Sequence, residues 1–107
     1  MSMYEERIRK GIARLDQDRP RAEWLPRVQG QEINMWDVRY DVLGRIYGHY
    51  TQAKEHLNLS SEEMDACGFG LANGTYDEWY YLEREWEEAL RGLSLEAEQE
   101  TKNVEYL

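Results

Sequence analysis

Hydrophobic residues recur at helical spacing in three segments of the chain. Intervals of three or four residues place such side chains on one face of an α-helix. The first segment, residues 2–15, carries Tyr4, Ile8, Ile12 and Leu15. The second, from Asp37 or Asp41 to Leu57, carries Val42, Leu43, Ile46, Tyr50, Ala53 and Leu57. The third, residues 75–92, carries Trp79, Leu82, Trp86, Ala89 and Leu90, with Leu93 just beyond. Three main amphipathic helices are therefore predicted. Their common core should join Ile8, Ile12, Val42, Ile46, Tyr50, Trp79, Leu82 and Trp86.

Polar residues and glycines mark where these helices begin and end. A capping box pairs a Ser or Thr before the helix with a Glu three residues later. Three pairs fit this pattern: Ser2 with Glu5, Ser60 with Glu63, and Thr75 with Glu78. Gly68 and Gly92 stand where a glycine commonly follows a helix. We therefore expect one short additional helix before Gly68 and an end to the last main helix at Gly92.

The remaining segments lack a clear period. Residues 16–36 contain both prolines, Pro20 and Pro26, and proline interrupts regular structure because it fixes φ and has no N–H. This stretch is predicted to be a long connection held on the core by Trp24, Leu25, Val28, Ile33 and Met35. Residues 93–107 form an acidic, weakly patterned tail, which we expect to be frayed or docked only at its end.

No strand pattern or internal repeat is visible. The prediction is an all-α, single-domain bundle of three main helices and one short helix, with a long Pro- and Trp-containing connection after the first helix. A helical domain over residues 1–92 is followed by the acidic tail, residues 93–107.

Charge and cysteine content narrow the function. The net charge is −9, and residues 61–107 hold thirteen acidic and three basic residues. An acidic domain repels phosphate backbones, so direct nucleic-acid binding is not expected, whereas a basic partner is favoured. A single cysteine excludes an internal disulfide and a multi-cysteine metal site. Without a long apolar run or a signal-peptide core, the chain is expected to be cytoplasmic, with no membrane contact.

The stretch "CGFGLANG", residues 67–74, raises the question of a phosphate-binding loop. A dinucleotide fingerprint needs G-x-G-x-x-G between a strand and a helix. Here Gly68 and Gly70 are followed by Asn73, and Gly74 comes one position late. The glycines are better explained as a helix stop and a turn, so no cofactor is predicted.

Candidate catalytic and metal-binding residues do not converge. His49 and His56 lie seven residues apart on the second predicted helix, about 10 Å along its axis, too far to share one ion. Glu83, Glu87 and Glu88 are expected on a solvated surface, without the burial or like-charged neighbour that a catalytic acid needs. We therefore expect no catalytic residue, no metal ligand and no enzymatic activity.

Two surfaces are the candidate partner-binding sites. Gly44 and Gly48 lie four residues apart in the second predicted helix, and each glycine costs a helix about 1 kcal/mol relative to alanine. They indicate either close packing of another segment of this chain or a bare groove beside Tyr47. The second surface is the outer face of the last helix. Its candidate residues are Tyr80, Tyr81, Arg84, Glu87 and Glu88, and the alternative is an ordinary solvated face.

The stretch "DVLGRIYGHYTQAKEHLNL", followed by "GFG" and "YDEWYYLEREWEEAL", resembles a family of small uncharacterised proteins from actinobacteria and their bacteriophages. The upstream "RPRAEWLPRVQGQEINM" also fits that family, so the resemblance spans residues 11–92. Asp41 and Arg45 depart from the family pattern, where Cys and Gln are usual. The resemblance implies a phage or prophage gene expressed in a bacterial cytoplasm and no particular mechanism.

Three functions remain open. The first is a small acidic interaction protein that binds and modulates a bacterial host protein without catalysis. The second is a DNA mimic that occupies the nucleic-acid channel of a restriction, CRISPR or transcription protein. The third is a small structural homo-oligomer, because the four Trp and eight Tyr residues suit self-association.

Overall fold

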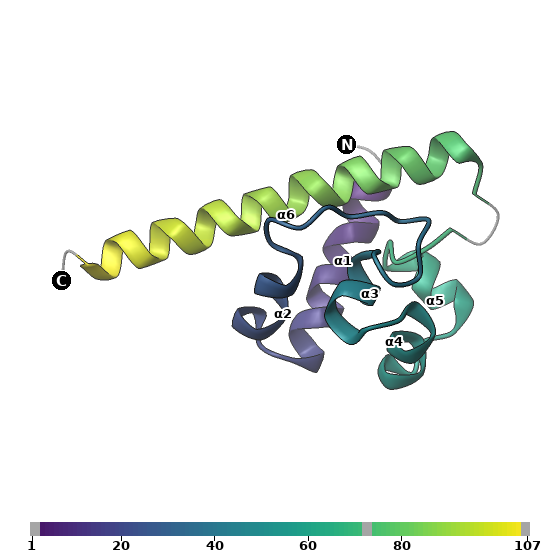
Figure 1. Ribbon diagram of the computed structural model, residues 1–107, viewed down its shortest axis with the longest axis horizontal. Helices are drawn as coiled ribbons and strands as arrows, with labels where there is room; N and C mark the ends of the chain where they lie inside the picture. Colours follow the sequence, from purple (N-terminus) through teal and green to yellow (C-terminus); the bar gives the residue numbers. More distant parts are fainter. Residues whose placement is uncertain (1–2, 72–73, 106–107) are drawn as a thin grey trace.

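The structure, a computed structural model, describes residues 3–71 and 74–105, which contain six α-helices and no strand (Figure 1). The helices are α1 (Met3–Asp18), α2 (Arg21–Val28), α3 (Val42–Tyr47), α4 (Tyr50–Leu57), α5 (Ser61–Ala66) and α6 (Tyr76–Glu105). The predicted all-α class is confirmed.

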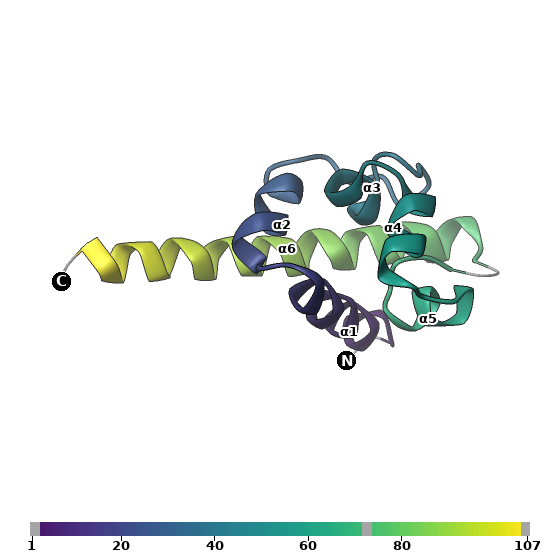
Figure 2. The same ribbon diagram turned by 90° about the horizontal axis from the view of Figure 1, so that it is seen from below.

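The long helix α6 organises the molecule. The other five helices gather along its N-terminal half, and its C-terminal half extends past α2 (Figure 1). Seen from below, α2 and α3 lie on one side of α6 and α1 on the other (Figure 2). The predicted end at Gly92 is wrong, because α6 runs for 30 residues through that position. One glycine costs a helix only about 1 kcal/mol, and the leucines, glutamates and alanine that follow are good helix formers. The tail is therefore helical to Glu105.

The core joins the hydrophobic faces of the three predicted helices. Ile8, Val42, Ile46, Leu82 and Trp86 are each at most 2% exposed. Ile12, Tyr50 and Trp79 are partly buried and pack against this cluster. The five residues predicted to hold the connection on the core are buried as well.

The predicted connection over residues 16–36 nevertheless contains a helix, α2, which the sequence analysis missed. Pro20 precedes its first turn with φ −58° and ψ 145°, and the Pro20 carbonyl accepts from the N–H groups of Glu23 and Trp24. Pro26 lies inside the helix and cannot donate to the carbonyl of Ala22. Because Ala22 is exposed, water can satisfy that carbonyl.

The second predicted helix is in fact two. Gly48 has φ +97°, outside the range of helical residues, and ends α3. His49 is extended and caps α4, with its Nδ1 accepting from the Thr51 N–H at 3.0 Å. Glycine tolerates a positive φ because it has no Cβ, so the chain turns here between two helices that share one hydrophobic pattern.

The predicted caps at Ser60 and Thr75 are confirmed, the first as a complete capping box and the second by the hydrogen bond to the threonine hydroxyl. Ser60 Oγ accepts from the Glu63 N–H at 3.1 Å, and Glu63 Oε1 accepts from the Ser60 N–H at 3.0 Å, which completes the capping box of α5. Gly68, with φ +71°, follows the end of α5. Thr75 Oγ1 accepts from the Glu78 N–H at the start of α6. Ser2 and Asn73, which entered two other predicted motifs, lie outside the described residues.

Candidate functional site

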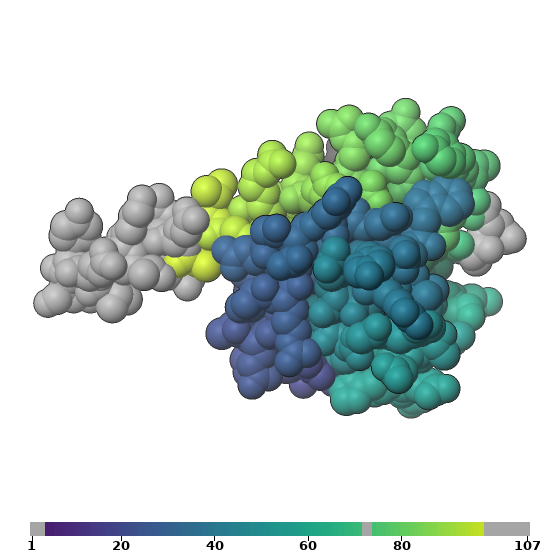
Figure 3. Space-filling view, in the orientation of Figure 1, coloured from purple at the N-terminus to yellow at the C-terminus, as the bar shows by residue number. Residues whose placement is uncertain are grey.

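The segment between α2 and α3 forms one side of the candidate site. In Figure 3 it appears in blue, lying against the green N-terminal part of α6. Met35 is buried and its N–H donates to Glu83 Oε1 of α6 at 3.0 Å. The Asn34 N–H donates to the Tyr40 carbonyl at 3.0 Å, and the Asp37 N–H donates to the Asn34 carbonyl at 3.0 Å. These bonds hold the segment as a compact loop beside the first turns of α6.

This loop brings Trp36 onto a group of exposed aromatic rings. The centroid of the Trp36 ring lies 5.5 Å from that of Tyr76 and 5.7 Å from that of Trp79. Tyr80 shares a hollow of about 300 Å³ with Trp36 and Tyr76, and its ring centroid lies 6.0 Å from that of Tyr81. Trp36, Tyr76, Tyr80 and Tyr81 are 53%, 72%, 46% and 58% exposed. We call these four residues the aromatic surface.

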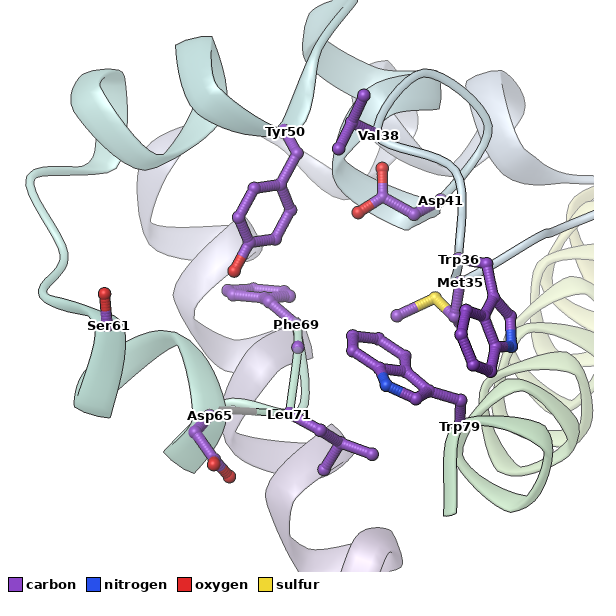
Figure 4. Close-up of a pocket in the computed structure, with 11 residues that line it drawn as sticks. Met35, Trp36, Val38, Asp41, Tyr50, Ser61, Asp65, Phe69, Leu71 and Trp79 are labelled. Carbon is purple, nitrogen blue, oxygen red and sulfur yellow. The ribbon is translucent and has the colours of Figure 1, made fainter. Parts of the chain in front are cut away.

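Next to the aromatic surface lies a cavity of about 410 Å³, which we call the aromatic pocket. This volume falls within the usual range of small-molecule sites. Four of its lining side chains are aromatic: Trp36, Tyr50, Phe69 and Trp79. Its other lining residues are Met35, Val38, Asp41, Ser61, Asp65, Gly70 and Leu71. In Figure 4 Tyr50, Phe69, Met35 and Trp79 surround a common space, with the Asp41 carboxylate at its edge.

Asp41 is the unusual polar group of this pocket. It is the residue before α3, and its Oδ1 accepts from the Gly44 N–H at 2.6 Å. It is only 2% exposed. Burial is the main cause that raises the pKa of the Asp41 carboxyl to about 7; the negative charge of Asp37 contributes in the same direction, while backbone hydrogen bonds act in the opposite direction. A carboxyl with such a pKa changes charge near neutral pH.

The charged lining of the pocket is acidic. Asp65 of α5 forms an ion pair with Arg7 of α1. Asp41 has no ion-pair partner within the part of the chain that the structure describes, and none of the described lining residues is basic. Burial raises the pKa of the Tyr50 hydroxyl, and the charges of Asp41 and Asp65 add to this effect. The pocket therefore combines aromatic walls with one buried, unpaired carboxyl group.

The predicted outer face of α6 lies where helical periodicity placed it. Tyr80, Tyr81, Arg84, Glu87 and Glu88 are all exposed. The Arg84 guanidinium lies 5.8 Å from the centroid of the Tyr80 ring, a distance typical of a cation–π contact. These residues are available to a partner, and their role in binding stays a prediction.

The other predicted surface is not an open groove. Gly44 is buried, and a Cβ at this position would lie 2.5–2.6 Å from backbone atoms of Val38 and Arg39. The groove interpretation is therefore wrong at Gly44, and close packing by this chain's own loop explains the glycine. The Tyr47 hydroxyl donates to Asp18 of α1 at 2.7 Å, so it ties α3 to α1. Gly48 is exposed and serves to end α3.

The histidines and the cysteine have separate structural surroundings. His49 caps α4, whereas His56 Nε2 lies 2.9 Å from Asp18 Oδ1. Among the side chains that the structure describes, no three from His, Cys, Asp or Glu gather closely enough to hold a metal ion. Burial raises the pKa of the Cys67 thiol, which lowers its reactivity because the thiolate is the nucleophile.

The sequence analysis missed the two residues that define the pocket. An Asp just before a run of hydrophobic residues at helical spacing is a recognised helix-start signal. The sequence could therefore have predicted that Asp41 caps a helix. The burial of Asp41 could not be predicted in this way, because the pocket beside it is completed by other segments, among them Phe69 and Trp79. Trp36 was predicted only as the last residue of the connection over residues 16–36.

Comparisons of the chain with known protein families, with curated proteins and with solved structures find no match. No helix in the described part of the chain is long and apolar enough to cross a membrane.

Proposed function

We propose that this chain is a non-catalytic interaction protein that docks onto a protein partner through its aromatic surface. One observation carries the proposal. Of the large hydrophobic residues that are exposed among those described, all but Leu95 lie in the loop over residues 36–40 or in the first two turns of α6: Trp36, Val38, Tyr40, Tyr76, Tyr80 and Tyr81. Concentrated exposed apolar area marks interaction sites, and Trp and Tyr often carry most of the binding energy of an interface.

The charge next to this surface supports a basic partner. Glu87 and Glu88 follow Tyr80 and Tyr81 along the exposed face of α6. Charges at the rim of an interface speed encounter, while buried aromatic anchors slow dissociation. The sequence resemblance supplies the setting that we propose, in which a phage or prophage protein binds and modulates a bacterial host protein.

Catalysis is not part of the proposal. Ser61 lies at the rim of the pocket, and its Oγ accepts from Lys54 Nζ at 2.9 Å. A serine nucleophile needs a partner that takes its proton, whereas this lysine donates, and the contact is exposed to solvent. Asp41 accepts a capping hydrogen bond from the Gly44 N–H, which gives this carboxyl a structural role.

Site-specific photo-crosslinking tests the proposed interface. Benzoylphenylalanine is placed at Tyr76 or Tyr81, with Gln52 near Gly48 as the alternative surface and exposed Gln17 of α1 as the control. We expect one discrete crosslinked host protein from Tyr76 and Tyr81, and none from Gln17. Crosslinking from Gln52 alone would move the interface to the α3–α4 turn and contradict the proposal.

Variants of the same surface separate the competing functions once the partner is identified. Tyr81→Ala should weaken binding by more than about 1 kcal/mol, mainly through faster dissociation. Neutralising Glu87 and Glu88 should slow association and flatten its salt dependence. If the charge changes abolish binding and Tyr81→Ala does nothing, the protein is a DNA mimic. If the crosslinked partner is a second copy of this chain, it is a homo-oligomer.

A further inference from the structure

We propose that the aromatic pocket binds a methylated ammonium group, presented either by a side chain of the partner or by a free organic cation. If the ammonium group belongs to a partner side chain, the inference rests on the proposed function. The pocket itself can be tested on the isolated protein. It assigns a ligand chemistry to the cavity beside the aromatic surface.

The walls of the pocket favour a cation with an apolar surface. Trp36, Tyr50, Phe69 and Trp79 contribute rings from four separate segments of the chain: the loop before α3, α4, the loop after α5, and α6. The face of an aromatic ring attracts cations, and cages of such rings bind quaternary ammonium groups. The cavity, about 410 Å³, is large enough for a trimethylammonium group and part of the chain that carries it.

The polar groups of the pocket favour the same ligand. Asp41 supplies a carboxyl group that is 2% exposed and has no ion-pair partner among the described residues. A buried carboxylate is costly when unpaired, so a bound cation would stabilise its charged form. No described lining residue carries a positive side chain to repel that cation.

Methylation is favoured because both carboxyl groups that line the pocket already have a hydrogen-bonding partner. One oxygen of Asp41 already accepts from the Gly44 N–H, and Asp65 is paired with Arg7. A primary ammonium group needs acceptors for three N–H bonds. A trimethylammonium group needs none and instead covers the aromatic walls.

The mouth of the pocket lies beside the aromatic surface. Trp36 belongs to both, with one ring contact to Tyr76 on the surface and another to Trp79 inside. Ser61 on the opposite rim is also exposed. A partner seated on the aromatic surface could therefore insert a side chain past Trp36.

Calorimetric titration of the isolated protein with choline tests the proposal, and 3,3-dimethylbutan-1-ol is the uncharged control of the same shape. At pH 8 we expect choline to bind at least about tenfold more tightly than the alcohol. Equal affinity for the two, or no choline binding at about 10 mM, would overturn the assignment.

Two variants locate the binding. Asp41→Asn retains a capping oxygen and should lower choline affinity at least about tenfold at pH 8, with no change for the alcohol. Trp36→Leu should weaken choline binding without touching the core, because Trp36 is 53% exposed. Gln17→Ala, at an exposed position of α1 outside both the aromatic surface and the pocket, is the control and should leave choline affinity unchanged. Loss of choline binding in Gln17→Ala with none in the other two variants would contradict a site in the pocket.

The pH dependence gives an independent readout. Besides Asp41, the charged and ionisable groups near this region include Asp37 of the loop, Tyr50 of α4 and Asp65 of α5. Two cations contact lining residues: Lys54 donates to Ser61, and Arg7 pairs with Asp65. Choline affinity should rise from pH 6 to pH 8 as Asp41 ionises, and Asp41→Asn should remove the rise. A rise that persists in Asp41→Asn would contradict the role of this carboxyl.

Titration with a short peptide that carries one trimethyllysine distinguishes the two sources of the cation. If the peptide binds at least about tenfold more tightly than choline, the ligand is a side chain of the partner. If choline binds at least about tenfold more tightly than the peptide, the ligand is a free cation. Because these titrations use no partner protein, choline binding can succeed while the crosslinking experiment fails, and the reverse.

Discussion

The buried carboxyl of Asp41 predicts that removing its charge stabilises the protein. Asp41→Asn keeps the shape of the side chain and an oxygen that can accept from the Gly44 N–H, and Asn is as good a helix cap as Asp. The variant loses only the ability to ionise in a site that is 2% exposed. We therefore expect Asp41→Asn to be more stable than the parent protein at pH 8.

The size of the effect follows from the pKa of Asp41. Burial raises this pKa from an ordinary value of 3.8 to about 7 in the folded protein. Below pH 3.8 the carboxyl is protonated in both states, so the stabilisation from its neutral form is fully present. As pH rises toward 7, only the unfolded chain ionises freely and the folded state loses stability. Each pKa unit of this shift corresponds to 1.36 kcal/mol, so the free energy of unfolding falls by at most about 4 kcal/mol above pH 7.

Urea unfolding followed by circular dichroism at pH 4 and pH 8 measures this effect. We expect Asp41→Asn to raise the free energy of unfolding at pH 8 by about 1–4 kcal/mol and to change it much less at pH 4. Glu55→Gln, at an exposed position of α4, is the control and should change stability by less than about 0.5 kcal/mol. Destabilisation of Asp41→Asn at pH 8 would refute the reasoning, because it would mean that the folded protein stabilises the carboxylate.

Three further substitutions test the fold. Trp86→Ala should lower the free energy of unfolding by about 3–5 kcal/mol, because the ring is fully buried and its Nε1 donates to the Gly68 carbonyl at 2.6 Å; a loss below about 1 kcal/mol in urea unfolding would contradict this packing. Gly44→Ala should destabilise by more than about 2 kcal/mol, since its Cβ would meet the backbone of the loop at 2.5–2.6 Å. Gly92→Ala has open space around its Cβ inside α6 and should instead stabilise by up to about 1 kcal/mol. If the melting temperatures of the two glycine variants shift in the same direction, the crowding at Gly44 or the open space at Gly92 is contradicted.

A stabilising Asp41→Asn would also bear on function. A residue that lowers stability above pH 7 and lies in a cavity is typical of sites where function opposes stability. If the same variant also loses choline binding, then the Asp41 carboxylate both lowers the stability of the folded protein and binds the cation.

Much of the fold was determined by local sequence signals. The capping box of α5, the threonine cap of α6 and the glycine after α5 depend on residues within a few positions of one another, so the sequence alone predicts them. The stripes that form the core also follow from helical periodicity. The same periodicity placed Tyr80 and Tyr81 on the exposed face of α6.

Local signals failed where tertiary contacts overrode a weak preference. Pro20 and Pro26 indicated a connection, yet α2 forms because Trp24 and Leu25 are buried against the rest of the core. Gly48 was predicted inside a helix and Gly92 at the end of one, but Gly48 has a positive φ and ends α3, whereas α6 continues through Gly92. Helix propensities differ by about 1 kcal/mol, which packing readily outweighs.

The aromatic pocket was decided by the tertiary structure. Asp41 is buried, and Trp36 lies against Tyr76 and Trp79, only because the loop before α3 docks on α6 through contacts such as the Met35 N–H with Glu83. These partners are about forty or more positions apart in the chain. Sequence periodicity determines which face of a helix is apolar, but it contains no information about which distant segment covers that face. Burial, and with it the raised pKa of Asp41, arises only when the segments meet.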